Sequence, residues 1–379
     1  MFETSFDVAI IGAGIVGLAH ALAASRLGLR VVVLDRDAQA NGASVRNFGF
    51  VTVTGQAAGQ VWHRARRSRD VWMEIAGPAG IAIEQRGLLM VAQRPEAAAV
   101  IDAFLRTDMA EGCAWLDRAA TVDALGAAPA RIEGALSSAI DLRVESRTAI
   151  PALARWLERE GRVTIRRGVA VHGVATGRIE TDAGTIRADA IIVCPGDDFA
   201  TLFPATLAAA GLTRCKLQMM RLAPPSRPRL PATVMTDLSL VRYLGYAALP
   251  EAAALRSRLE REQPDHFAHG VHLIVAQGTD GSLIVGDSHH YAATPDPFAS
   301  DAVERLILDE FESLFGAAPP VLERWTGTYA SAAGPVLVET PADDVRLVMV
   351  TGGTGASIGF ALAEDVIGEL VGRPVGVFA

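Results

Sequence analysis

The first apolar run of the chain leads into a cluster of glycines. Residues 6–14, "FDVAIIGAG", have the continuous apolar pattern of a buried parallel strand, and residues 15–28, "IVGLAHALAASRLG", follow with helical periodicity up to Gly28. Residues 30–37, "RVVVLDRD", form the next apolar run, which reaches Asp35. The pattern predicts a strand, a helix and a second strand, the unit that makes the first crossover of a parallel sheet.

The middle of the chain alternates the two periodicities less regularly. The pattern predicts helices at residues 60–76, 151–161 and 301–315, and Ala-rich helices with turns over 95–140. It predicts strands at 86–93, 163–177, 178–196, 215–222, 241–249, 271–277 and 282–291, and a loop at 43–55. Residues 345–372 read as a strand, a glycine-rich turn and a long helix. We interpret the basic run "HRARRSR", residues 63–69, as a solvated helix face.

Composition narrows the class of protein. The 379 residues are 50% hydrophobic and 21% charged, which is typical of a globular protein with one large or two ordinary domains. The net charge of −8 argues against nucleic acid or an anionic membrane as partner, and no apolar stretch of ~20 residues without turn signals is present. The acidic opening "MFETSFD" argues against a secretory leader, so we expect a cytoplasmic protein. Cys113, Cys194 and Cys215 lack zinc or disulfide spacing, so we expect no metal.

The glycine cluster carries the first chemical signal. Gly12 allows a tight turn, Gly14 lets a pyrophosphate approach the backbone, and Gly17 lets the helix pack on the strand. The phosphates then lie at a helix N-terminus, where amide groups and the helix dipole favour anions. Asp35 ends the next strand and has the place of a carboxylate that accepts hydrogen bonds from a ribose. This pattern fits NAD and FAD equally well.

A second strand–glycine–helix element lies near the end of the chain, at residues 349–361, "MVTGGTGASIGFA". A nicotinamide-binding domain is usually complete in its first half, whereas a two-domain flavoprotein closes its site with a late segment. A helix N-terminus facing the flavin pyrimidine would stabilise negative charge on the reduced ring. The late element therefore favours FAD, with an NAD(P)-dependent dehydrogenase and a non-catalytic flavin-binding protein as alternatives.

The order of these segments resembles the D-amino-acid oxidase, glycine oxidase and monomeric sarcosine oxidase superfamily. The resemblance rests on "DVAIIGAGIVGLA", "VVVLDRD", "GASVRNFG", "DAIIVCPGDDF" and "RLVMVTGGTGASIGFALAEDV" and covers essentially the whole chain. It implies an α/β plus antiparallel β fold with two domains. A split Rossmann-like FAD-binding domain would comprise residues 1–84, 142–213 and 326–379, and an interleaved mixed-sheet substrate domain residues 85–141 and 214–325.

The resemblance also implies which residues hold FAD. The "GASVRN" segment, residues 42–47, matches the loop beside the flavin ring, and Pro195 and Gly196 match a turn under the adenine half. Gly327 or its neighbour stands where some relatives carry a cysteine linked to flavin, so we expect non-covalent FAD. The full predicted set is Gly12, Gly14, Ile15, Val16, Asp35, Arg36, Ser44, Asn47, Val169, Pro195, Gly196, Gly353, Thr354, Gly355, Ala356, Ser357 and Ile358.

One departure from the family bears on the substrate. Amino-acid-type members carry a carboxylate-binding arginine in a Gly-x-Arg-Pro pattern, and Tyr329 stands at the matching position here. A bidentate carboxylate clamp is therefore missing at that position. "GASVRNFG", "KLQMMR", "VAQGTDGSLIVGDSHHY" and "GTYAS" more narrowly resemble a bacterial subgroup linked to aminophosphonate breakdown. That resemblance implies 2-aminoethylphosphonate or its N-methyl derivative as substrate and phosphonoacetaldehyde as product.

The expected reaction is oxidative deamination or N-dealkylation of a small amine, with hydride transfer from the α-carbon to flavin N5 and O2 or another acceptor taking up the electrons. The alternative substrates are glycine, sarcosine and D-amino acids. The expected molecule is a monomer or homodimer. Catalytic candidates are Lys216, His289 and Tyr329, and substrate-binding candidates are Arg46, Asn47, Gln218, Arg242 and His290.

Overall fold

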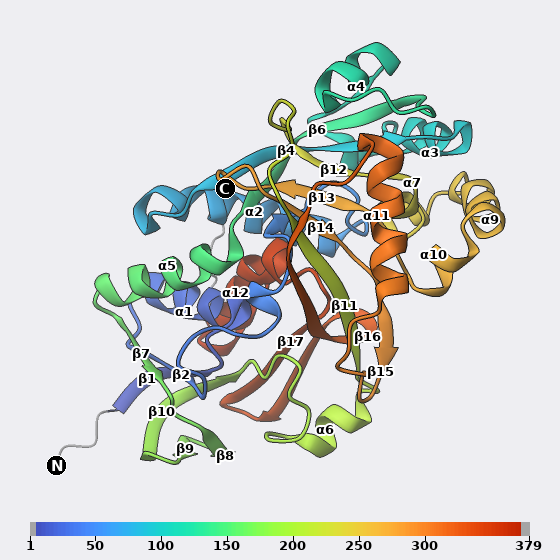
Figure 1. The fold of residues 1–379 in the computed structure, drawn as a ribbon. Coiled ribbons are helices and arrows are strands. Elements are labelled where there is room, and N and C mark those ends of the chain that lie inside the picture. The colour runs from blue at the N-terminus through green and yellow to red at the C-terminus, as the bar shows by residue number, and fades with distance from the viewer. Residues whose placement is uncertain (1–4, 373–379) are drawn as a thin grey trace.

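The structure is a computed structural model that describes residues 5–372 (Figure 1). Its first sheet is parallel, in the order β7–β2–β1–β10–β17. The bounds are β1 (Ser5–Ile11), β2 (Val31–Asp35), β7 (Val163–Arg167), β10 (Gly184–Val193) and β17 (Val345–Gly352). Val8, Val32 and Ile192 are fully buried, as in a parallel sheet covered on both faces. The predicted strand–helix–strand unit at the N-terminus is confirmed.

Four helices cover one face of this sheet and share one apolar core with it. They are α1 (Ile15–Arg26), α2 (Gln60–Ala79), α5 (Ser146–Arg159) and α12 (Gly355–Leu370). Figure 1 shows α1, α5 and α12 grouped together. The other face is covered by a second core that includes Phe6, Val32, Ile179 and Met349.

The interpretation of residues 63–69 as a solvated helix face is wrong for part of the run. Arg64 pairs with Asp365 at 2.9 Å and Arg67 with Glu364 at 2.9 Å, so two of the arginines lie against α12. The basic face of α2 is matched by acidic residues on a helix distant in the sequence. Pairing of this kind gives no local sequence signal.

The second sheet is mixed and is joined to the first by one long strand. β16 (Val321–Ala342) pairs antiparallel with β17 of the first sheet and with β11 (Thr213–Leu222) of the second. From β11 the ladder continues through β14 (Leu283–Gly286), β13 (Ile274–Gln277), β12 (Thr233–Met235), β4 (Ile83–Ala92) and β6 (Gly134–Val144). β3 (Phe50–Val51) and β5 (Cys113–Leu116) pair with β6, and β15 (His290–Ala292) pairs with β11.

The remaining elements connect these sheets. They are η1 (Ala43–Val45), α3 (Pro95–Phe104), η2 (Asp108–Ala110), α4 (Arg118–Leu125), β8 (Val171–Ala175), β9 (Arg178–Thr181), α6 (Pro204–Ala209), α7 (Asp237–Leu240), α8 (Leu244–Ala247), α9 (Ala252–Glu262), α10 (Pro264–Ala268) and α11 (Asp301–Phe315). The predicted strand at 241–249 is wrong, because this segment forms the turn between α7 and α8 followed by α8. The prediction for 95–140 missed β5 and most of β6.

The predicted fold class, α/β combined with a mixed, largely antiparallel sheet, is confirmed. The exact domain boundaries stay a prediction, and residues 1–4 and 373–379 of the first and last predicted segments lie outside the described residues. Over the described part of the chain, no helix combines the length and hydrophobicity that crossing a bilayer requires.

Candidate active site

A cavity of about 610 Å³ is lined by residues of both sheets and of the helices beside them. One part of its lining comes from the glycine loop, from η1 with the residues after it, and from the start of α12. The other part comes from the α7–α8 turn and from the segments around β13 and β14. The cavity therefore joins the two nucleotide-type motifs of the sequence to the second sheet.

The conformation of the glycine loop between β1 and α1 requires residues without a side chain. Gly12 has a φ of +102°, and a side chain there would collide with the carbonyl oxygen of Cys194. A side chain at Gly17 would collide with the carbonyl oxygen of Gly12, so only glycine lets α1 pack this closely. The N-cap residue Gly14 contributes no side-chain hydrogen bond, and Ser44 Oγ accepts from the Ile15 N–H at 2.9 Å.

Asp35 lies beside this loop. Its carboxylate accepts hydrogen bonds from the Ala13 N–H at 2.7 Å and the Asp37 N–H at 2.9 Å, and its backbone oxygen accepts from the Val169 N–H at 3.0 Å. Arg36 instead forms an exposed ion pair with Asp198 at 2.6 Å. Five of the predicted FAD residues near this end are outside the described lining of the cavity, whereas Gly196 is part of it: Gly12, Asp35, Arg36, Val169 and Pro195.

A second helix N-terminus opens onto the same cavity. Gly353 adopts a φ of +72°, and α12 begins after the N-cap residue Thr354, which contributes no side-chain hydrogen bond. Ser357 Oγ accepts from the Thr52 N–H at 2.9 Å, which fastens the first turn. The lining contains Gly353, Thr354, Gly355, Ala356 and Ser357, while Ile358 is buried in an adjacent apolar cluster.

These features fit FAD. Two helix N-termini face one cavity, and neither N-cap residue contributes a side-chain hydrogen bond. Ser44 Oγ accepts from the Ile15 N–H of α1, and the other N–H groups of the two first turns require acceptors. A dinucleotide with a pyrophosphate and an electron-rich ring supplies such acceptors. The residues of both glycine motifs therefore match the cofactor that the sequence predicts.

Arg242 is a cation in the part of the cavity wall that the α7–α8 turn contributes. It lies in the α7–α8 turn, lines the cavity and donates to Tyr291 Oη at 3.0 Å. Among residues 5–372 no carboxylate oxygen lies within 4.0 Å of its guanidinium nitrogens. Burial lowers the pKa of Arg242, but Tyr291, Tyr329 and Asp287 outweigh burial and raise it. The guanidinium therefore stays charged.

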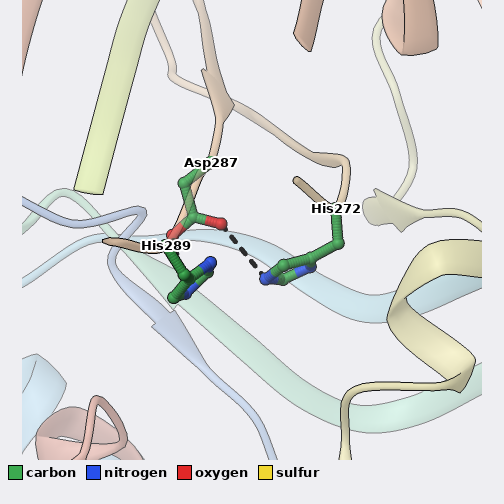
Figure 2. A group of neighbouring side chains, drawn as sticks. All are labelled: His272, Asp287 and His289. Carbon is green, nitrogen blue, oxygen red and sulfur yellow. Dashed lines mark ion pairs between the residues drawn. The ribbon is translucent and has the colours of Figure 1, made fainter. Parts of the chain in front are cut away.

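A buried cluster of His272, Asp287 and His289 lies in the same wall (Figure 2). His272 Nε2 lies 3.1 Å from Asp287 Oδ1, and His289 Nε2 lies 3.7 Å from Asp287 Oδ2. Burial lowers the pKa of His272 and lowers that of His289 to about 3. Burial raises the pKa of Asp287, but the two histidines and Arg242 outweigh it and lower the pKa. The cluster is a carboxylate anion between two neutral imidazoles.

The sequence prediction identified His289 but missed His272 and Asp287. β13 and β14 form a hairpin, and beyond its ladder the backbones of His272 and Asp287 exchange hydrogen bonds of 3.1 and 3.0 Å. The available signal was two polar residues, each at the end of an apolar strand pattern in one hairpin.

Other predicted residues do reach the cavity. The described lining includes Arg46, Asn47 and Tyr329. Arg46 donates to Asn41 Oδ1 at 3.0 Å and to the Thr326 carbonyl at 3.5 Å. The polar atoms of Asn47 bind Ala43, Gly49 and Ser146, so Asn47 holds its own loop in place.

Lys216, Gln218 and His290 are not among the described lining residues. Lys216 Nζ donates to the Phe298 carbonyl at 2.9 Å, and Gln218 exchanges hydrogen bonds with the backbone of Ser300. His290 Nε2 lies 2.9 Å from His269 Nδ1. Side chains alternate along β11, and its cavity-lining residue Leu217 alternates with these two, so Lys216 and Gln218 point to the opposite face.

Comparison with known proteins agrees with this geometry. A protein-family model described as FAD dependent oxidoreductase, DAO, matches residues 7–368. Similar solved structures include a glycine oxidase from Geobacillus kaustophilus, with 18% identity, a TM-score of 0.75, and coverage of 99% of this chain and 96% of that one. An L-proline dehydrogenase from P. horikoshii gives 16% identity, a TM-score of 0.79, and coverage of 98% and 95%.

An iminodiacetate oxidase from Chelativorans sp. BNC1 gives 18% identity, a TM-score of 0.73, and coverage of 98% of this chain and 97% of that chain. A search of curated protein sequences found no match. At these identities the solved structures support the fold alone. The family match spans nearly the whole chain, and this protein therefore belongs to the DAO family of FAD-dependent oxidoreductases.

Proposed function

We propose that the protein oxidises a small amine that carries a phosphonate group, with 2-aminoethylphosphonate or its N-methyl derivative as substrate. Two-electron oxidation of the amine gives an imine, and water hydrolyses the imine to phosphonoacetaldehyde and ammonia or methylamine. O2 takes up the two electrons and two protons and leaves as H2O2. The family match makes the chain an FAD-dependent enzyme, which removes the NAD(P)-dependent alternative. The amine and the phosphonate are the parts that this proposal adds.

The observation that carries the proposal is the unpaired Arg242 in the cavity wall. The charged side chains of the described lining are Arg46, Arg242 and Asp287, so the cations outnumber the anion. Arg242, Tyr291 and Tyr329 also supply separate donors, which suit a tetrahedral group with three acceptor oxygens.

The side chains around the cavity set the conditions for the reaction. When bound, FAD supplies the acceptor for a hydride from the α-carbon of the amine. Phe48, Phe50 and Leu217 line the cavity and exclude water from the reacting carbon. Gly327 has no nucleophilic side chain, and an added Cβ would lie 3.0 Å from the Arg46 carbonyl oxygen, so we propose that FAD is held without a covalent bond.

A second candidate is an oxidase of glycine, sarcosine or D-amino acids, because the planar guanidinium of Arg242 also matches a carboxylate. Stopped-flow measurement of flavin bleaching separates the two candidates. We expect 2-aminoethylphosphonate or its N-methyl form to bleach the flavin faster than glycine, sarcosine or D-alanine at equal concentration.

A tenfold preference in kcat/KM for sarcosine or a D-amino acid corresponds to ~1.4 kcal/mol of transition-state preference and would overturn the phosphonate assignment. Bleaching by none of these amines would favour a flavoprotein that is not an amine oxidase. Glycine and D-alanine serve as the comparison arms, since they share a primary amine and carry a carboxylate on the amine-bearing carbon in place of the phosphonate one carbon away.

A further inference from the structure

The atoms with which His289 and Asp287 face each other, Nε2 and Oδ2, are both hydrogen-bond acceptors. His289 Nδ1 lies 2.9 Å from the carbonyl oxygen of Gly270, and a carbonyl only accepts, so the proton of the neutral ring is on Nδ1. Nε2 then carries a lone pair and lies 3.7 Å from Asp287 Oδ2, which is also an acceptor. Two buried acceptors at this separation leave a place for a donor between or beside them.

The other oxygen of Asp287, Oδ1, faces His272. His272 Nε2 lies 3.1 Å from Oδ1, and Ser239 Oγ lies 3.1 Å from His272 Nδ1, so a hydroxyl and a carboxylate hold the two ring nitrogens of His272. The rings of His272 and His289 stack at 5.2 Å (Figure 2). His272 therefore covers the Oδ1 side of Asp287, and no described residue donates a hydrogen bond to Oδ2.

We propose that Asp287 Oδ2 and His289 Nε2 form the amine-binding site of the cavity and accept hydrogen bonds from the N–H groups of the substrate. This inference rests on the proposed amine oxidation but not on the phosphonate. A primary amine fills both acceptors with two N–H groups and keeps its lone pair free. A neutral tertiary amine has no N–H group and is excluded. Together with Arg242, the site selects ligands with an amine at one end and an anion at the other.

The same acceptors attract any cation, so a divalent metal ion is the competing occupant. The candidate ligand atoms of His272, Asp287 and His289 all lie within 4.8 Å of one another. Two features favour the amine. His272 already lies 3.1 Å from the Asp287 carboxylate, and the positive charge of Arg242 acts on both Asp287 and His289.

The test compares ligands that differ only in the amine. The FAD-loaded protein is reduced anaerobically with dithionite, so that substrates bind without turnover, and calorimetry gives the Kd of 2-aminoethylphosphonate and of ethylphosphonate. Glycine and acetate form a second pair. We expect the wild-type protein to bind the amine-bearing member at least tenfold more tightly, and Asp287→Asn to reduce that ratio below threefold while ethylphosphonate affinity changes less than twofold.

Asp237→Asn is the matched control. Asp237 is equally buried and pairs with Arg94 at 2.9 Å, but it is not part of the described cavity lining, so the ratio should stay at the wild-type value. His289→Asn is the second variant in case Asp287→Asn does not fold. It removes the Nε2 acceptor, keeps the carboxylate, and should also reduce the ratio.

Equal loss of affinity for both members of a pair would overturn the inference. So would a stoichiometric metal ion in the purified wild-type protein that is lost in Asp287→Asn. If the wild-type protein binds neither phosphonate, the phosphonate substrate fails and the glycine–acetate pair decides the inference alone. A wild-type protein without preference in either pair contradicts the amine site.

Discussion

At the scale of single residues, the cavity separates its charges. Arg242 donates to a tyrosine hydroxyl rather than to a carboxylate, whereas Asp287 is held between two neutral histidines. Oppositely charged groups in one buried wall usually form a direct ion pair, because an isolated charge loses its hydration. Keeping the two apart leaves each available to a ligand of opposite charge, which suits a ligand that carries both signs.

Arg242→Met should weaken binding of the anionic end of the substrate. The variant removes a charged donor at similar side-chain length, and a hydrogen bond to a charged group contributes ~2 kcal/mol, so KM for the amine substrate should rise roughly 30-fold. Steady-state kinetics measures the change. Arg66→Met is the control, because Arg66 pairs with the exposed Glu111 at 2.8 Å and is outside the described lining. Equal effects of both variants would contradict the role of Arg242.

At the scale of elements, α1 combines an N-terminus that borders the cavity with a buried histidine. His20 is fully buried, its Nδ1 lies 2.7 Å from the Val16 carbonyl, and its Nε2 has no partner among the described residues. Burial lowers the pKa of His20 from its ordinary value of 6.5 to about 4. In α1, which begins at the glycine loop, the imidazole of His20 therefore stays neutral in the apolar core at pH values at which an exposed histidine is protonated.

His20→Leu should reduce the acid sensitivity of the fold. As the pH falls from 6.5 towards 4, the unfolded chain takes up a proton on His20 and the folded chain does not, so the free energy of unfolding decreases by about 3 kcal/mol. Leucine removes that contribution. Denaturant unfolding at several pH values should show that the free energy of unfolding falls less with decreasing pH in the variant than in the wild-type protein. The same dependence of the free energy of unfolding on pH in both proteins would mean that the pKa of His20 is not lowered in the folded state.

The sequence predicted those elements whose structure is determined by residues close together in the chain. The glycine spacing at both ends follows from collisions that only glycine avoids, such as that between a Gly17 side chain and the Gly12 carbonyl. The sequence did not predict on which face of the sheet the Lys216 side chain lies. That face depends on how β11 pairs with β16 and on which side of the sheet the cavity forms. The meeting of His272 and Asp287 likewise depends on the register of a hairpin.

At the scale of the whole molecule, the cavity lies where segments distant in sequence meet. Its lining runs from Gly14 near the start of the chain to Ser357 near its end, and it includes residues of the second sheet such as Ile274. β16 pairs with strands of both sheets, so a single strand links the two parts around the cavity. A cofactor bound there contacts both parts and should stabilise them as one unit.

Removal and return of FAD should therefore change the stability of the whole protein. We expect a yellow protein that releases intact FAD on heating or acid treatment, since Gly327 offers no atom for a covalent bond. Returning FAD to the apoprotein at 100 times its Kd should add ~2.7 kcal/mol and raise the Tm by roughly 3 °C, because only the folded state binds it. Differential scanning calorimetry measures the shift.

Asp35→Ala should need a higher concentration of FAD for the same Tm shift, because the carboxylate beside the glycine loop is lost. Flavin that stays on the acid-precipitated protein would contradict non-covalent binding, and a Tm that does not respond to FAD would contradict the placement of the cofactor in this cavity.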